Sequence, residues 1–203
     1  MMRIREIVLD ILFPKKCLGC NKEGKYICKN CELFMLDLSE AWPLTSFWEY
    51  NGVVKKAIHQ IKYGGTYDMV RELVNKKEFE IDKNTIITFV PMYIKKEKER
   101  GFNQAEIIAK ELRKKTGLPV AKLLEKVKET SDQASLDREH RLTNLKNTFA
   151  ICDKPGLYKP CLLQNILLVD DVYTTGATME ECRKVLYKAG FRNINYFTLA
   201  RTV

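Results

Sequence analysis

The residues of this chain best suited to chemistry lie near its C-terminal end, in the stretch ILLVDDVYTTGAT at 166–178. Four apolar residues, typical of a buried strand, lead into Asp170 and Asp171, and residues 174–178 then lead into a helical pattern. Adjacent carboxylates can accept hydrogen bonds from a vicinal diol and can also hold a hydrated divalent cation. Hydroxyls and backbone N–H groups at a helix N-terminus bind anions, and Gly176 lets the backbone approach closely. A diol beside a phosphate is the pattern of a ribose 5-phosphate.

Other phosphate-binding patterns do not fit this chain. An ATPase would add G-x-x-x-x-G-K-[ST], and a dinucleotide-binding fold would add G-x-G-x-x-G after an early strand; neither stretch occurs in the sequence. A receiver-type phosphoacceptor site carries its acidic pair early in the domain, whereas Asp171 lies close to the end of this 203-residue chain. A sugar-phosphate ligand is therefore the interpretation that remains.

A second group of candidate ligands lies in the N-terminal part, where four of the seven cysteines form two C-x2-C pairs. Cys17 pairs with Cys20, and Cys28 pairs with Cys31. Each pair presents two thiolates from a tight turn, and two such turns complete a tetrahedral zinc site. Since no coordination position stays open, we predict a structural zinc knuckle or short ribbon. Disulfides are less favoured, because the sequence shows no secretion signal.

The scaffold for both groups is expected to be an α/β fold. Apolar periodicity predicts helices at 5–13, 53–61, 103–116 and 179–189, and buried strands at 85–92, 166–169 and 194–199. Strands that alternate with helices indicate a parallel sheet with right-handed crossovers. Ligands of such sheets bind outside the carboxyl ends of the strands, where the two acids fall. We expect residues 1–45 to form a helix with the zinc knuckle, and residues 46–203 to form the main domain.

The composition is that of a globular protein with a basic surplus. The apolar fraction is 45%, and no window of 18 apolar residues occurs, so no transmembrane span is expected. Charges interrupt the apolar stretch at the N-terminus, and no small-residue cleavage site follows, so we expect a cytoplasmic protein. The net charge of +9 suits nucleic acid, phosphorylated substrates or acidic lipid, although a lysine surplus also arises without any functional role.

Several stretches of the chain resemble a known family. The stretch at 166–178 resembles the phosphoribosyl-pyrophosphate (PRPP) motif of type I phosphoribosyltransferases: an apolar strand, an acidic pair and a T-T-G-x-T phosphate loop. Over nearly its whole length the chain is similar to the ComF family of competence-associated, phosphoribosyltransferase-like proteins. The further matches are LFPKKCLGC…CKNC at 12–31, VPM at 90–92, ERGFNQA at 99–105, and the spaced set Gln133, Leu136, Arg138, Arg141, Asn144 and Phe149. The resemblance implies a type I phosphoribosyltransferase fold with a small N-terminal four-cysteine zinc knuckle.

The resemblance also implies roles for individual residues. PRPP would be held by Asp170, Asp171, Val172, Thr174, Thr175, Gly176, Ala177 and Thr178. The two acids would bind the ribose 2- and 3-hydroxyls, and the loop would bind the 5-phosphate. Arg100 would contact the pyrophosphate, whereas Lys95, Lys96 and Lys98 are expected to be a solvated helix entry. The stretch KYGG at 62–65 also resembles a family feature, but its residues suggest no role of their own.

A polar segment at 128–149 corresponds to the loop that closes over substrate in this superfamily. Gln133, Arg138 and Arg141 would then reach the ligand on closure. The alternative for this segment is a surface helix held by charge pairs.

Two functions are compatible with these residues. The first is a transferase that moves phosphoribose from PRPP to an acceptor with Mg²⁺ and releases pyrophosphate, with Asp170, Asp171 and Arg100 at the reacting centre. The second is a non-catalytic competence factor that binds single-stranded DNA and keeps PRPP as a regulatory or vestigial ligand. We expect a PRPP-binding protein that serves DNA uptake, with structural zinc, and with single-stranded DNA and other DNA-uptake proteins as partners.

Overall fold

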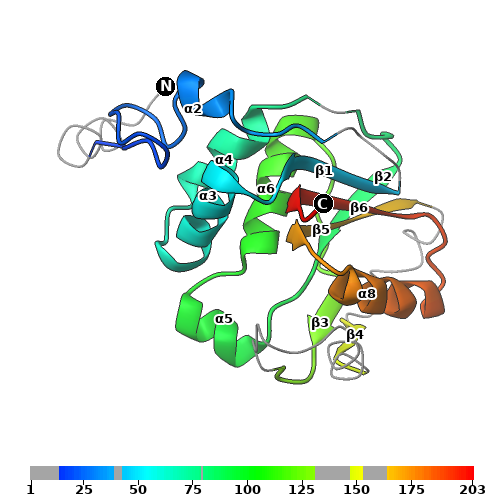
Figure 1. The fold of residues 1–203 in the computed structure, drawn as a ribbon. Coiled ribbons are helices and arrows are strands. Elements are labelled where there is room, and N and C mark those ends of the chain that lie inside the picture. The colour runs from blue at the N-terminus through cyan, green and yellow to red at the C-terminus, as the bar shows by residue number, and fades with distance from the viewer. Residues whose placement is uncertain (1–13, 39–42, 79, 131–146, 153–163) are drawn as a thin grey trace.

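The computed structural model describes residues 14–38, 43–78, 80–130, 147–152 and 164–203. Its centre is a four-stranded sheet with strand order β1-β6-β5-β2, in which every neighbouring pair is parallel (Figure 1). The strands are β1 (Leu44–Glu49), β2 (Thr85–Phe89), β5 (Asn165–Tyr173) and β6 (Ile194–Arg201). The predicted parallel α/β sheet is confirmed.

Helices cover both faces of the sheet, which explains why its strands are almost continuously apolar. Side chains alternate along a strand, so Leu167 and Val169 of β5 join one core and Ile166 and Leu168 join the other. The first core is closed by α3 (Gly52–Tyr63), α4 (Asp68–Asn75) and α6 (Gln104–Thr116), and the second by α8 (Ala177–Lys188). The carboxyl ends of β5 and β6 are turned toward α3 and α5 (Figure 1).

Shorter elements surround the main sheet. Residues 119–121 run parallel to β2, since Ile87 donates to the carbonyl of Pro119 and accepts from Ala121, both at 2.9 Å. An antiparallel pair of β3 (Leu124–Lys126) and β4 (Phe149–Ile151) packs into the core beside α8. The remaining helices are α2 (Lys29–Glu32), inside the four-cysteine segment, and α5 (Ile94–Arg100), which follows β2.

The predicted elements differ from the structure mainly at their ends. The strand predicted at 166–169 runs from Asn165 to Tyr173, so Asp170 and Asp171 lie inside β5 and not beyond it. The strand predicted at 85–92 ends at Phe89, two residues before Pro91. The helix predicted at 5–13 lies outside the described residues. The domain division at residue 45 stays a prediction, and β1 begins at Leu44.

Among the described residues, no helix combines the length and the apolar character needed to cross a bilayer.

Candidate ligand and metal sites

The two acids of β5 point to opposite faces of the sheet. Asp171 is only 5% exposed and meets Lys62 of α3, whereas Asp170 is half-buried on the side of Lys126 and Cys182. The Asp171 N–H donates to Asp170 Oδ1 at 2.9 Å, which fixes the Asp170 carboxylate at the strand end. Burial first, and then the charge of Asp171, raise the pKa of Asp170 to about 7. The protein therefore holds this carboxylate in a state that favours a proton or a cation.

Lys62 is the charge partner of Asp171. Its Nζ lies 2.9 Å from Asp171 Oδ2, with the Lys62 side chain 25% exposed. Burial lowers the pKa of Lys62, but the charges of Asp171 and Asp170 together outweigh burial, so that pKa lies above its ordinary value. Asp171 Oδ2 is buried and receives no well-aligned hydrogen bond from any described group. A carboxylate oxygen has more than one lone pair, so Asp171 Oδ2 can still accept a ligand hydroxyl beside its contact with Lys62.

Lys62 lies one residue beyond the helix predicted at 53–61 and within α3, which ends at Tyr63, and it belongs to the KYGG stretch for which the sequence suggested no role. Gly64 caps α3, and its N–H donates to the carbonyl of Gln60 at 2.7 Å. The contact with Asp171 joins residues far apart in the chain, so the only signal for it in the sequence was the resemblance of KYGG to a family feature.

The loop after β5 has the geometry of an anion-binding turn. Gly176 has φ of 75°, and a Cβ at this position would overlap the Tyr173 ring, so both backbone and packing require glycine. Helix α8 begins at Ala177, whose N–H donates to Thr175 Oγ1 at 3.4 Å. The first N–H groups of a helix have no carbonyl partner within it and carry its positive dipole end.

The other loop residues predicted to bind PRPP surround this turn. Thr174 is exposed, while Thr175 and Thr178 are half-buried. Ala177 is buried, and the half-buried Val172 side chain packs against the first core. Val172 and Ala177 are thus placed to offer backbone groups, and the threonines to offer hydroxyls as well.

Lys62 and Lys126 are close enough to the acids to act on Asp170, and Lys96 and Arg100 extend this group of cations from α5. Burial first, and then the charges of Arg100, Lys126 and Lys62, lower the pKa of Lys96. Burial likewise lowers the pKa of Lys126, against the opposing charge of Asp170. Lys95 and Lys98 are exposed, as expected for a solvated helix entry, whereas Lys96 is half-buried. Cations held close enough to lower one another's affinity for protons are suited to a polyanion.

Arg100 lies at the C-terminus of α5, where Gly101 ends the helix with φ of 84°. Its Nη1 donates to Gln104 Oε1 at 2.9 Å, and its guanidinium carbon lies 5.3 Å from the centre of the Tyr63 ring. These two contacts hold Arg100 between α6 and the end of α3.

Asn103, in the same ERGFNQA stretch, is a positioning residue that sequence analysis noted only as a helix start. It is 4% exposed, accepts from the Ala105 N–H at 3.0 Å, and donates from Nδ2 to the carbonyl of Val90 at 3.0 Å. The N-terminus of α6 is thereby tied to the chain that leaves β2.

The predicted lid residues Gln133, Arg138 and Arg141 lie outside the described residues. The described flanks of this segment lie side by side, because the Val127 N–H donates to the carbonyl of Thr148 at 2.8 Å. Lys126, just before Val127, forms a parallel β-bridge with Tyr93, which follows β2. Thr148 and Phe149, which the prediction included in the lid, are buried, and Phe149 belongs to β4.

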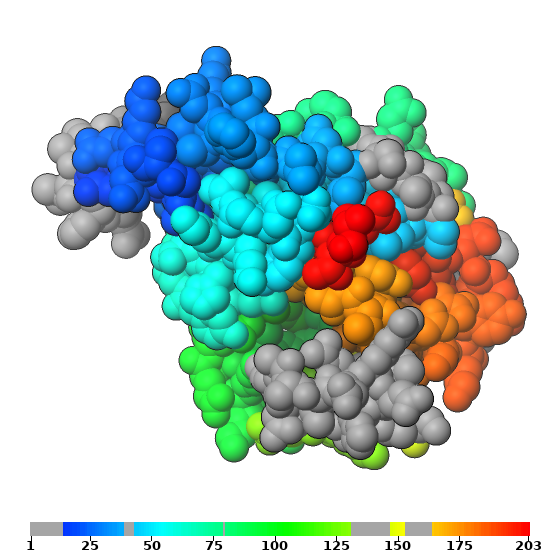
Figure 2. Space-filling model, viewed as in Figure 1, coloured from blue at the N-terminus to red at the C-terminus, as the bar shows by residue number. Residues whose placement is uncertain are grey.

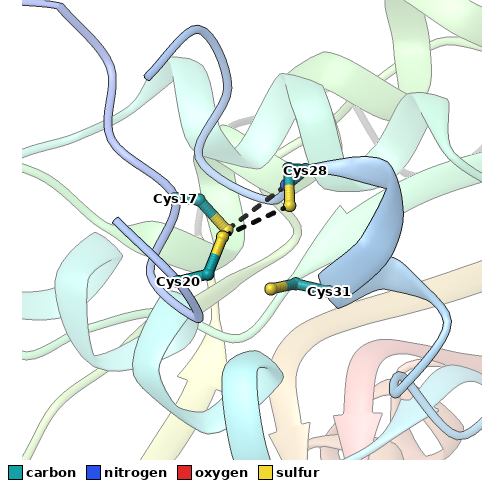
Figure 3. Close-up of side chains that lie close together, drawn as sticks. All are labelled: Cys17, Cys20, Cys28 and Cys31. Carbon is teal, nitrogen blue, oxygen red and sulfur yellow. Dashed lines mark hydrogen bonds between the residues drawn. The ribbon is translucent and has the colours of Figure 1, made fainter. Parts of the chain in front are cut away.

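The four cysteines converge as predicted (Figure 3). Their sulfurs all lie within 4.8 Å of one another, and those of Cys20 and Cys28 are 3.6 Å apart. A tetrahedral site with Zn–S bonds of about 2.3 Å separates its sulfurs by roughly 3.8 Å, so the residues fit zinc. The Cys28 N–H donates to Cys17 Sγ at 3.4 Å, and a Cβ on Gly19 would collide with Cys31 Sγ.

The thiols of this cluster influence one another strongly. Burial raises the pKa of Cys17, but backbone N–H groups, led by that of Cys28, outweigh it and lower the pKa to about 6. The neighbouring Cys17 thiol raises the pKa of Cys31 to about 12. Four thiols at this spacing ionise together only if a cation compensates their charge. No disulfide joins the cysteines within the described ranges.

The four-cysteine segment is bound tightly to α4. The Glu72 carboxylate accepts from the N–H groups of Tyr26 and Ile27, at 3.3 and 3.0 Å. The Tyr26 hydroxyl donates to Asp68 at 2.9 Å, and Ile27 is fully buried in the core of the main sheet. The predicted fold class, a mainly parallel sheet flanked by helices with an N-terminal four-cysteine cluster, is confirmed by these features.

Comparison with known proteins shows clear relatives along most of the chain. It is 30% identical to competence protein ComFC of Streptococcus pneumoniae over 190 residues, 92% of this chain and 81% of that protein. It is 28% identical to competence protein F of Haemophilus influenzae, over 91% of this chain and 84% of the relative. It is 24% identical to the DNA utilization protein YhgH of Escherichia coli K12, over 92% of this chain and 89% of that protein. No family model matches the chain.

Two solved structures show weaker similarity, each with 15% sequence identity. One is an allosteric regulatory enzyme of purine biosynthesis, with a TM-score of 0.40 over 68% of this chain and 26% of that one. The other is a purine phosphoribosyltransferase from Pyrococcus horikoshii, with a TM-score of 0.34 over 73% of this chain and 82% of that one. These TM-scores support no argument about function.

Proposed function

The chain belongs to the ComF family of competence proteins, and we propose that it binds PRPP together with Mg²⁺ at the carboxyl edge of its sheet. The observation that carries this proposal is the juxtaposition of Asp171 and the loop at 174–178. One offers a buried carboxylate oxygen without a well-aligned hydrogen bond, and the other offers a helix N-terminus beside threonine hydroxyls. These groups match a ribose diol and a 5-phosphate respectively.

The described residues also include groups that could bind the pyrophosphate of PRPP and its Mg²⁺. Lys62, Lys96 and Arg100 supply the positive charge that a pyrophosphate needs. Asp170 and Asp171 are the residues that would hold a hydrated Mg²⁺ with the sugar, since hard cations prefer carboxylate oxygens. When bound, Mg²⁺ would neutralise charge on the leaving pyrophosphate.

Phosphoribosyl transfer at this site would need little acid–base chemistry from the protein. The bond from the anomeric carbon to pyrophosphate breaks as the acceptor bond forms, and the sugar becomes cationic in between. The negative charges of Asp170 and Asp171 would favour that cationic sugar, and the cations at 62, 96 and 100 would favour the departing anion. The protein would thus either transfer phosphoribose from PRPP to an acceptor or bind PRPP without transferring it.

A DNA role is the second part of the proposal. The relatives are named for competence and for DNA utilization, and the net charge of +9 suits a phosphate backbone. We infer that the chain serves DNA uptake by binding single-stranded DNA, with PRPP as its substrate or its regulator, and that it works beside other DNA-uptake proteins in the cytoplasm.

Calorimetric titration of PRPP with Mg²⁺ tests the binding site. The Asp170→Asn/Asp171→Asn double variant is expected to lose binding. Asp82→Asn is the control, because Asp82 is an exposed acid that contacts Asn165, the first residue of β5, at the strand end remote from the two acids. Equal affinity in wild type and double variant would refute the assignment. Release of pyrophosphate in the presence of an acceptor panel then separates transfer from binding alone.

A further inference from the structure

An open groove of about 600 Å³ lies beside the proposed PRPP site, between the end of α3 and α5. Its lining combines three rings, Tyr63, Tyr67 and Phe102, with three cations, Lys62, Lys96 and Arg100, and with one carboxylate, that of Glu99. Figure 2 shows a hollow where the cyan, green and orange segments meet, and the residues that line the groove, at 62–67 and 96–102, belong to the cyan and green segments. PRPP has no aromatic ring, so the proposed donor site leaves the three rings without a function.

The rings are held in place although they face water. Tyr63 is 66% exposed and Tyr67 is 45% exposed. Exposing this much aromatic surface to water is unfavourable in free energy, and such surface is typical of a site that a ligand covers on binding. Phe102 supports Tyr67 edge-to-face, with centroids 4.6 Å apart at 83°. Arg100 lies over Tyr63 at 5.3 Å, so a cation is fixed beside an open aromatic surface.

We propose that this groove binds an unpaired nucleotide, with its base stacked on Tyr63 and Tyr67 and its phosphate beside Lys96 and Arg100. Exposed rings interleaved with cations are the common platform for unpaired bases, because every base has a π-face and every nucleotide carries a charge. Bases in a duplex are already stacked on each other and cannot enter. The nucleotide belongs either to a single strand or to a free mononucleotide.

The proposal rests on the nucleic-acid part of the proposed function and gives it a location. Lys62 lines the groove and also pairs with Asp171, so the groove opens directly onto the proposed PRPP site. The base would then lie next to the sugar-phosphate ligand and not on a distant surface.

Fluorescence anisotropy with a labelled single strand of about 12 nucleotides, a length within the usual range of such sites, tests the groove. The variant is Tyr63→Ala/Tyr67→Ala. The matched control is Tyr187→Ala, because Tyr187 is 49% exposed and has Arg192 4.5 Å from its ring centre, yet lies on α8 outside the groove. Both changes remove exposed side chains, and an unchanged circular-dichroism spectrum and melting temperature show that the fold is intact.

The double variant is expected to weaken strand binding by about fivefold to 100-fold, a range typical of lost base stacking. The salt dependence should keep most of its slope, since the variant removes no cationic side chain. Tyr63→Phe/Tyr67→Phe should restore the affinity, and the control should equal wild type. An unlabelled duplex should compete poorly, whereas competition by a mononucleotide would identify a free nucleotide as the ligand.

Two results would overturn different claims. If wild type binds neither strand nor mononucleotide at low salt, the nucleic-acid part of the proposed function fails, and the groove proposal fails with it. If wild type binds a strand and the double variant binds it equally well, only the groove proposal fails, and the strand is held elsewhere by charge.

Discussion

Replacing Asp170 by Asn separates the stability of the fold from the binding of its ligand. Asp170 is half-buried next to Asp171, and these surroundings raise its pKa from 3.8 to about 7. Asn keeps the oxygen that accepts from the Asp171 N–H at 2.9 Å, and it removes the charge. We therefore expect Asp170→Asn to stabilise the ligand-free protein at alkaline pH while it abolishes PRPP binding with Mg²⁺.

The sign and size follow from proton linkage. Below about pH 4 both folded and unfolded chains hold the proton, and Asp170 has no net effect. Between about pH 4 and 7 the folded chain keeps a proton that the unfolded chain releases, so wild-type stability falls as pH rises. Each pKa unit corresponds to about 1.4 kcal/mol, so the full shift gives an upper limit of about 4 kcal/mol. Since Asp170 is partly open to water and its charge is shared with Asp171, we expect about 1–3 kcal/mol.

The assay is urea unfolding of both proteins from pH 5.5 to 8.5, in buffer without Mg²⁺ and without chelator. The unfolding free energy of the variant should exceed that of wild type, and the difference should grow with pH and level off above pH 7. The Asp82→Asn control should have the same unfolding free energy as wild type at every pH. A margin that is independent of pH, or a variant less stable than wild type at pH 8, would refute the reasoning.

Three further predictions concern other parts of the structure. Lys62→Met leaves Asp171 without its ion-pair partner, and we expect a loss of about 1–3 kcal/mol in unfolding free energy, together with a tenfold or greater loss of PRPP affinity by calorimetry. Gly176→Ala forces a left-handed alanine, at about 1–2 kcal/mol, and also overlaps the Tyr173 ring; adding Tyr173→Ala should recover only the part due to overlap. Elemental analysis should find one zinc per chain, and Cys28→Ala should lose it and lower the melting temperature, whereas Cys152→Ala should retain the metal.

The strongly periodic elements of the fold could be predicted from the sequence. Helices α3, α6 and α8 carry apolar stripes that match their buried faces, and their observed bounds lie close to the predicted ones. Strand β1 was not predicted, because its sequence LTSFWE mixes polar and apolar residues. Its Ser46 is buried only because the hydroxyl pairs with Thr198 of β6 at 2.7 Å, a partner that no local pattern reveals.

The sequence by itself determined the ligand groups that are neighbours in the chain: two C-x2-C turns and an acidic pair before a threonine-glycine loop. A few adjacent residues define such turns, so their spacing is enough to predict their chemistry. Only the tertiary structure decided that Asp170 and Asp171 face opposite sides of the sheet and that Lys62 pairs with one of them. It also decided that exposed rings and cations from α3 and α5 line one groove. Those contacts depend on how helices pack across the sheet, and the pattern within each element carries no information about that packing.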